Sequence, residues 1–73
     1  MFNKKKTYRF IARNIYTTRL FEIIDEQSSR EYGNCGPFET GYDFVIVKLS
    51  KKDMNKVSEK IKSENLGVRF GEL

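Results

Sequence analysis

The stretch from Tyr42 to Leu49 constrains the fold more than any other part of the sequence. It contains Phe44-Val45-Ile46-Val47, four consecutive apolar residues that are aromatic or β-branched. Such residues favour extended backbone, and the side chains of a strand alternate between the two faces of a sheet. Because both faces of this strand are apolar, we expect an interior strand, or an edge strand covered by a partner.

A helix is predicted directly after this strand, over residues 51–65. Ser50 stands at its N-cap position, where the hydroxyl can accept a hydrogen bond from the amide of Asp53. An apolar stripe then recurs at the spacing of one helix face, formed by Met54, Val57 and Ile61. Gly67 supplies the left-handed conformation that commonly follows a helix.

Three further segments complete the predicted fold. Residues 7–13 alternate apolar and basic side chains, which predicts a half-buried strand with one basic face, and residues 68–70 predict a short strand. Residues 17–31 fit either a helix or two strands. We prefer strand-turn-strand there, because Ile23-Ile24 is β-branched and Ser28-Ser29 favours a turn. Residues 33–41 are predicted to form a loop.

The predicted architecture is an α+β fold in the order β-β-β-β-α-β. A small antiparallel sheet of four to five strands carries a single helix packed on one face. With 73 residues, the chain is expected to form one small domain over 1–73, in which residues 1–6 are a flexible basic N-terminal tail.

Two residue counts exclude most enzymes. The sequence contains no histidine, and Cys35 is its only cysteine. The commonest general base and the usual zinc ligand sets are therefore missing, so we predict no catalytic residue, no metal site, no cofactor and no enzymatic activity. A lone cysteine cannot form an intramolecular disulfide, which favours a cytoplasmic protein, in the host cytoplasm if viral. The longest apolar run is too short to cross a membrane.

The charges are segregated along the chain. Residues 1–20 carry a net charge of +6, residues 21–43 carry −5 and residues 44–73 carry +3. Basic and aromatic side chains alternate near the N-terminus, a pattern that serves phosphate contacts and base stacking in single-strand binding. The candidate residues for binding a partner or a nucleic acid are Lys4, Lys5, Lys6, Tyr8, Arg9, Arg13, Tyr42 and Phe44.

The segment Gly41-Tyr42-Asp43-Phe44-Val45-Ile46-Val47 resembles the core strand of an RNA-recognition motif. Tyr42 and Phe44 match the two stacking aromatics of that family, and a helix and a short strand follow in both. Thr40, Asp43 and Val47 depart from the family pattern. Only about 23 residues separate Thr18 from Gly41, which we expect to be too few for the family's first helix and second strand.

These observations predict a binding protein. Frequent Lys, Asn, Ile, Phe, Tyr and Met have AT-rich codons, as in low-GC bacteria, their phages and mobile elements. We expect a phage or mobile-element modulator that inhibits a larger host protein by occupying its surface, because split charges and aromatic side chains suit such an interface. The alternative is a small RNA- or DNA-binding module that uses the basic-aromatic N-terminal strand. No membrane partner is expected, and a homodimer stays open.

Overall fold

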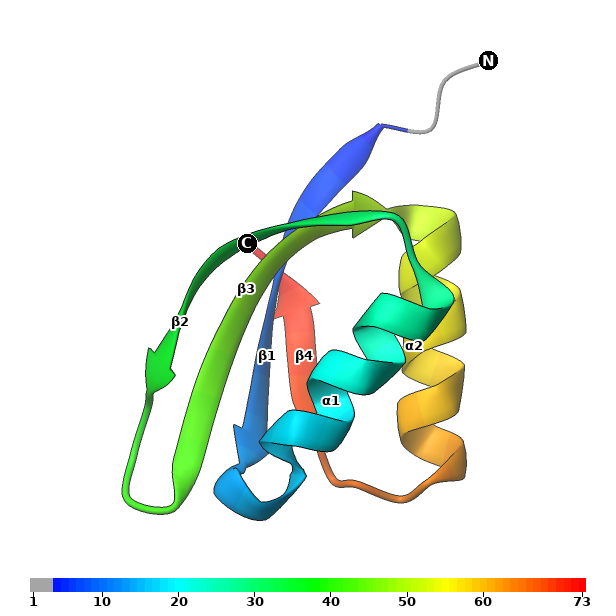
Figure 1. Ribbon diagram of the computed structural model, residues 1–73. Helices are drawn as coiled ribbons and strands as arrows, with labels where there is room; N and C mark the ends of the chain where they lie inside the picture. Colours follow the sequence, from blue (N-terminus) through cyan, green and yellow to red (C-terminus); the bar gives the residue numbers. More distant parts are fainter. Residues whose placement is uncertain (1–3) are drawn as a thin grey trace.

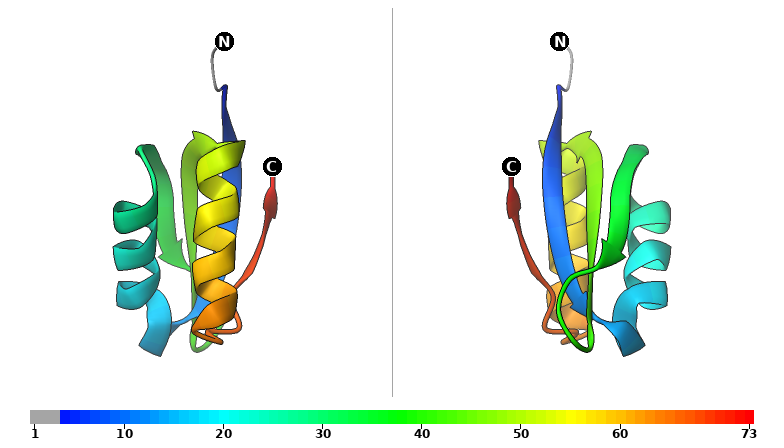
Figure 2. Two further views of the ribbon diagram at one scale, coloured as in Figure 1. Left: turned by 90° about the vertical axis from the view of Figure 1, so that its right-hand side faces the viewer. Right: turned by 90° about the vertical axis from the view of Figure 1, so that its left-hand side faces the viewer.

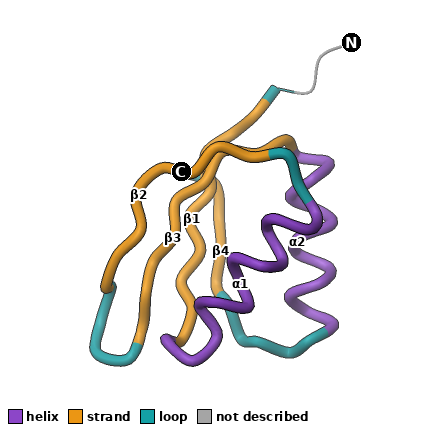
Figure 3. Tube along the Cα trace, in the orientation of Figure 1, coloured by secondary structure: helices purple, strands orange, loops and turns teal. Residues whose placement is uncertain are grey.

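The computed structural model describes residues 4–73, which form four strands and two helices in the order βαββαβ. Figure 1 and Figure 3 show the path of the chain. The elements are β1 (Lys5–Arg13), α1 (Asn14–Gln27), β2 (Arg30–Pro37), β3 (Tyr42–Ser50), α2 (Lys51–Ser63) and β4 (Arg69–Glu72). The predicted α+β class with a four-stranded antiparallel sheet is confirmed, whereas the single helix is wrong.

The four strands form one sheet in the order β2-β3-β1-β4, and every neighbouring pair is antiparallel. Strand β3 is therefore interior, as its apolar run predicts. Both helices pack on the same side of this sheet, and in the right-hand view of Figure 2 strand β1 lies in front of α2. No helix of residues 4–73 covers the opposite side, which we call the open face.

The core lies between the sheet and the two helices. Alternate residues of β1 and β3 point toward the helices, as the period-two alternation of a strand requires. The main core side chains are Tyr8, Phe10, Ala12, Val45, Val47 and Leu49 from the sheet, and Leu20, Ile23, Ile24, Met54, Val57 and Ile61 from the helices.

Helix α2 confirms the predicted cap and apolar stripe. The Asp53 amide donates to Ser50 Oγ at 3.1 Å, and the three stripe residues are buried. The helix ends at Ser63, two residues earlier than predicted, because Asn65 and Gly67 both take positive φ, 54° and 68°.

Helix α1 replaces the strand-turn-strand that the sequence favoured for residues 17–31, so that prediction is wrong. Leu20, Ile23 and Ile24 are all fully buried, at the i, i+3, i+4 spacing of one helix face. Burial against the sheet outweighs the strand preference of the two isoleucines. The expectation that the gap before Gly41 is too short for a helix and a strand is also wrong, because α1 and β2 both fit there.

Two chain segments differ in smaller ways from the prediction. Part of the expected loop 33–41 belongs to β2, an edge strand with a bulge between Tyr32 and Cys35. Lys5 and Lys6, expected in a flexible tail, are the first residues of β1, and residues 1–3 of that tail lie outside the described residues. Neither described helix is long and apolar enough to cross a membrane.

Candidate ligand-binding face of the sheet

Strand register sets the side chains of the open face in rows. Residues 9, 11 and 13 of β1 pair with residues 46, 44 and 42 of β3, and Ile11 also pairs with Arg69 of β4. Partners in an antiparallel pair lie on the same face of the sheet. The central residues of the open face are Arg9, Ile11, Arg13, Tyr42, Phe44, Ile46 and Arg69.

Three arginines of this face surround Ile11. Arg69 lies opposite Ile11 on β4, and Arg9 and Arg13 lie two residues to either side of it on β1. All three are exposed, and none forms an ion pair with a carboxylate of residues 4–73. Because like charges at this spacing repel one another, the face attracts anions.

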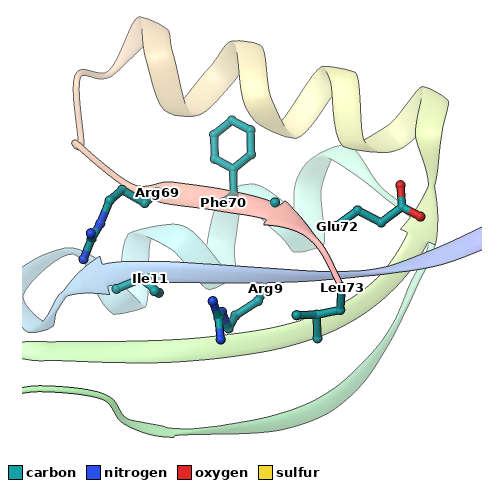
Figure 4. A pocket seen from close by; sticks show the side chains of 7 residues that line it. Arg9, Ile11, Arg69, Phe70, Glu72 and Leu73 are labelled. Atoms are coloured by element: carbon teal, nitrogen blue, oxygen red, sulfur yellow. The ribbon is translucent and has the colours of Figure 1, made fainter.

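A pocket of about 270 Å³ lies between β1 and β4 on this face, and Figure 4 shows its lining side chains. Arg9, Ile11 and Arg69 project to one side of the strands, whereas Phe70 projects toward α2. Gly71 pairs with Arg9, and a Cβ placed there meets no heavy atom within 4 Å. The pocket is therefore open beside the Arg9 side chain.

Strand β3 supplies a flat apolar surface next to the arginines. Tyr42, Phe44 and Ile46 are half-buried. The neighbouring strand β2 has glycines where these side chains lie against it: a Cβ at Gly36 would be 3.4 Å from the Phe44 ring, and one at Gly33 would be 3.4 Å from Ile46 Cγ2. Their missing side chains let Phe44 and Ile46 lie flat on β2, which suits stacking of a planar ring.

The structure brings together four of the eight predicted contact residues. Arg9, Arg13, Tyr42 and Phe44 share the open face. Tyr8 points toward the helices and is buried in the core, so it is not part of this surface. The remaining residues, Lys4, Lys5 and Lys6, are exposed at the far end of β1, where Lys6 Nζ lies 3.7 Å from Glu72 Oε2.

Sequence reasoning missed Arg69. The alternation of Val68, Arg69 and Phe70 places Arg69 opposite its apolar neighbours, but only the register of β4 against β1 brings it beside Ile11. Lys48 of β3 and Glu31 of β2 also pair on this face and offset each other's charge. Their opposite charges leave the β1–β4 end as its most basic part.

The arginines on the helix side of the sheet have carboxylate partners. Arg19 of α1 donates from Nε to Glu64 Oε1 at 2.7 Å and also pairs with Glu22. Hydrogen bonding from Arg19 lowers the pKa of Glu64 to about 2. Arg30 Nη2 lies 2.7 Å from Asp25 Oδ1, which also accepts from Tyr32. Burial, and next this hydrogen bond, raise the pKa of Tyr32 to about 12.

Among residues 4–73, no group of three His, Cys, Asp or Glu side chains is placed to hold a metal ion. Cys35 is an exposed free thiol of β2. It lines a small pocket together with Thr17 and Asp43, whose hydroxyl and carboxylate are hydrogen-bonded to each other at 2.8 Å.

Comparison with solved structures relates this fold to PII-like proteins. A PII-like signalling protein from Thermus thermophilus superposes with a TM-score of 0.73 and 14% identity, covering 94% of this chain and 83% of that one. CPII, a nitrogen regulatory PII-like protein from Thiomonas intermedia bound to ADP, AMP and bicarbonate, gives 0.63 and 9%, covering 94% and 89%. No family model and no curated protein matches the sequence.

These structural neighbours correct the functional prediction. The expected phage or mobile-element inhibitor of a host protein is wrong, because the chains that share this fold are PII-like signalling proteins. The alternative, a nucleic-acid-binding module, gains no support from them either. The fold is shared, and at 9–14% identity the likeness extends to the fold alone.

Proposed function

We propose that this protein is a small regulator that senses an adenine nucleotide on the open face of its sheet. The observation that carries the proposal is the group of three arginines around Ile11, which lack carboxylate partners among residues 4–73. Arginine binds phosphate through two parallel hydrogen bonds, and a phosphate would supply the negative charge that this group lacks.

The surface beside the arginines suits the base of such a ligand. Phe44 and Tyr42 are half-buried and lie one strand away from Ile11 and Arg13. Aromatic side chains stack on planar rings, and a half-buried ring is held in place by its neighbours. The structure of CPII with ADP, AMP and bicarbonate supports this choice, because a protein of the same fold takes anionic ligands that include two adenine nucleotides.

Regulation of this kind acts through binding. The full sequence contains no histidine, and the proposed activity needs no chemical step on the ligand. A ligand that neutralises the open face changes the charge that the protein presents to a partner. We therefore expect the signal to pass to a protein partner by a change in its affinity, in keeping with the signalling role of the neighbours.

Isothermal titration of the full chain with ADP and with AMP at 0.15 M salt tests the proposal. We expect saturable binding that weakens about tenfold or more in Arg9→Gln, because a charge-assisted hydrogen bond is lost. The matched control is Lys52→Gln, which removes one exposed charge from α2 on the other side of the sheet. Absence of binding to both nucleotides, or equal loss in both variants, would contradict the proposal.

A further inference from the structure

We infer that Arg69 makes the open face selective for a nucleoside diphosphate over a monophosphate. The inference rests on the proposed function and concerns the direction in which the ligand lies. It is carried by the order of side chains in one row across the sheet: Phe44 on β3, Ile11 on β1 and Arg69 on β4.

The length of this row matches the order of parts in a nucleotide. Adjacent strands are about 4.8 Å apart, so Phe44 and Arg69 are separated by roughly 10 Å across the sheet. A base stacked on Phe44 directs its ribose and first phosphate over Ile11, where Arg9 and Arg13 flank the row. A second phosphate then extends to β4 and reaches Arg69.

The charges of the face permit only this direction. Beyond Phe44 the row continues to Gly36 of β2, which has no cationic side chain. On the same strand, Glu31 pairs with Lys48 and offsets its charge. Phosphates placed toward β2 would therefore lose all three arginines, and the ligand is oriented with its phosphates toward β4.

There is space for a second phosphate at this end. Arg9, Ile11 and Arg69 line the pocket of about 270 Å³, and Gly71 leaves its floor free of a side chain. Arg69 itself is held by its neighbour Phe70, whose ring lies 5.8 Å from that of Phe10 in the core. The backbone of β4 is thus fixed by packing, while the Arg69 guanidinium is exposed and has no carboxylate partner among residues 4–73.

Titration of the wild-type protein and of Arg69→Gln with ADP and with AMP in metal-free buffer tests the inference. For the wild type we expect ADP to bind about tenfold or more tightly than AMP, the effect of one added charge-assisted contact. In Arg69→Gln this preference should fall to within about twofold, with AMP affinity nearly unchanged. Lys52→Gln, the control on α2, should keep the wild-type preference.

A second variant approaches the same pocket without touching Arg69. Gly71→Asp places a carboxylate beside Arg9 in open space, and we expect it to weaken ADP more than AMP. Circular dichroism of each variant verifies the fold. If AMP and ADP bind the wild type equally, or if Arg69→Gln weakens both to the same extent, the inference is overturned while the proposed function stands. If neither nucleotide binds, the proposed function fails as well.

Discussion

The two sides of the sheet use arginine in opposite ways. On the helix side, Arg19 joins α1 to α2 through Glu64, and Arg30 pairs with Asp25. On the open face, three arginines lie around Ile11 and have no carboxylate partner within residues 4–73. A cation with a partner holds elements of the fold together, whereas a cation without one is available to a ligand. The difference separates structural from functional charge in a chain with 14 basic residues.

The largest difference between the two sides is expected from phenylalanine. Phe10 is fully buried on the helix side of β1, and Phe44 is half-buried on the open face of β3. Phe10→Ala should lower the free energy of unfolding by about 3–5 kcal/mol, because it leaves a cavity in the core. Phe44→Ala should cost much less stability and should weaken ADP binding instead. Urea denaturation of both variants, with an ADP titration of Phe44→Ala, measures the contrast; equal losses of stability would contradict it.

How much of this arrangement the sequence predicts depends on whether the signal is local. Strand β3 and helix α2 are predicted because the apolar run, the Ser50 cap and the stripe lie within one continuous segment. Helix α1 has none of these signals: its N-cap residue Arg13 makes no side-chain cap, and its first turn has no acidic residue. Only packing of its buried face against the sheet shows it to be a helix.

The candidate site is divided in the same way. Arg9 and Arg13 alternate with apolar residues within one strand, so the sequence alone identifies a basic face. Arg69 lies about 60 residues from Arg9 in the chain and joins them only through the register of β4 with β1. Charge pairing is equally non-local, since Arg19 and Arg9 look alike in sequence until Glu64 is placed beside Arg19.

A smaller loss is expected from the cap of α2 on the helix side. The Ser50 hydroxyl accepts from the Asp53 amide at 3.1 Å. Ser50→Ala should therefore lower the free energy of unfolding by about 1 kcal/mol. The matched control is Ser58→Ala in the middle of α2, where alanine favours the helix and no such loss is expected. Thermal or urea denaturation distinguishes the two, and ADP binding should be the same in both variants.

The ion pair between Arg19 and Glu64 makes the helix side sensitive to acid. Its hydrogen bonds lower the pKa of Glu64 from 4.5 to about 2, so the folded state binds this proton less readily than the unfolded state. The stabilisation is present above pH 4.5 and is lost as the pH falls toward 2. Glu64→Gln should therefore be less stable than wild type at pH 7, and the difference should shrink at pH 2.5. Glu59→Gln, on the same helix and without an ion pair among residues 4–73, is the control.

The smallest effect on stability is expected where the effect on binding is large. Arg9→Gln removes a guanidinium that has no carboxylate partner among residues 4–73 and lies near two other arginines on the same face. Losing such a charge costs no ion pair and relieves repulsion, so the free energy of unfolding should change by less than about 0.5 kcal/mol, in the stabilising direction. Urea denaturation at low salt measures this most sensitively, because salt screens repulsion between exposed charges. A clear destabilisation would show that Arg9 has a structural role after all, and the contrast between the two faces would then no longer hold.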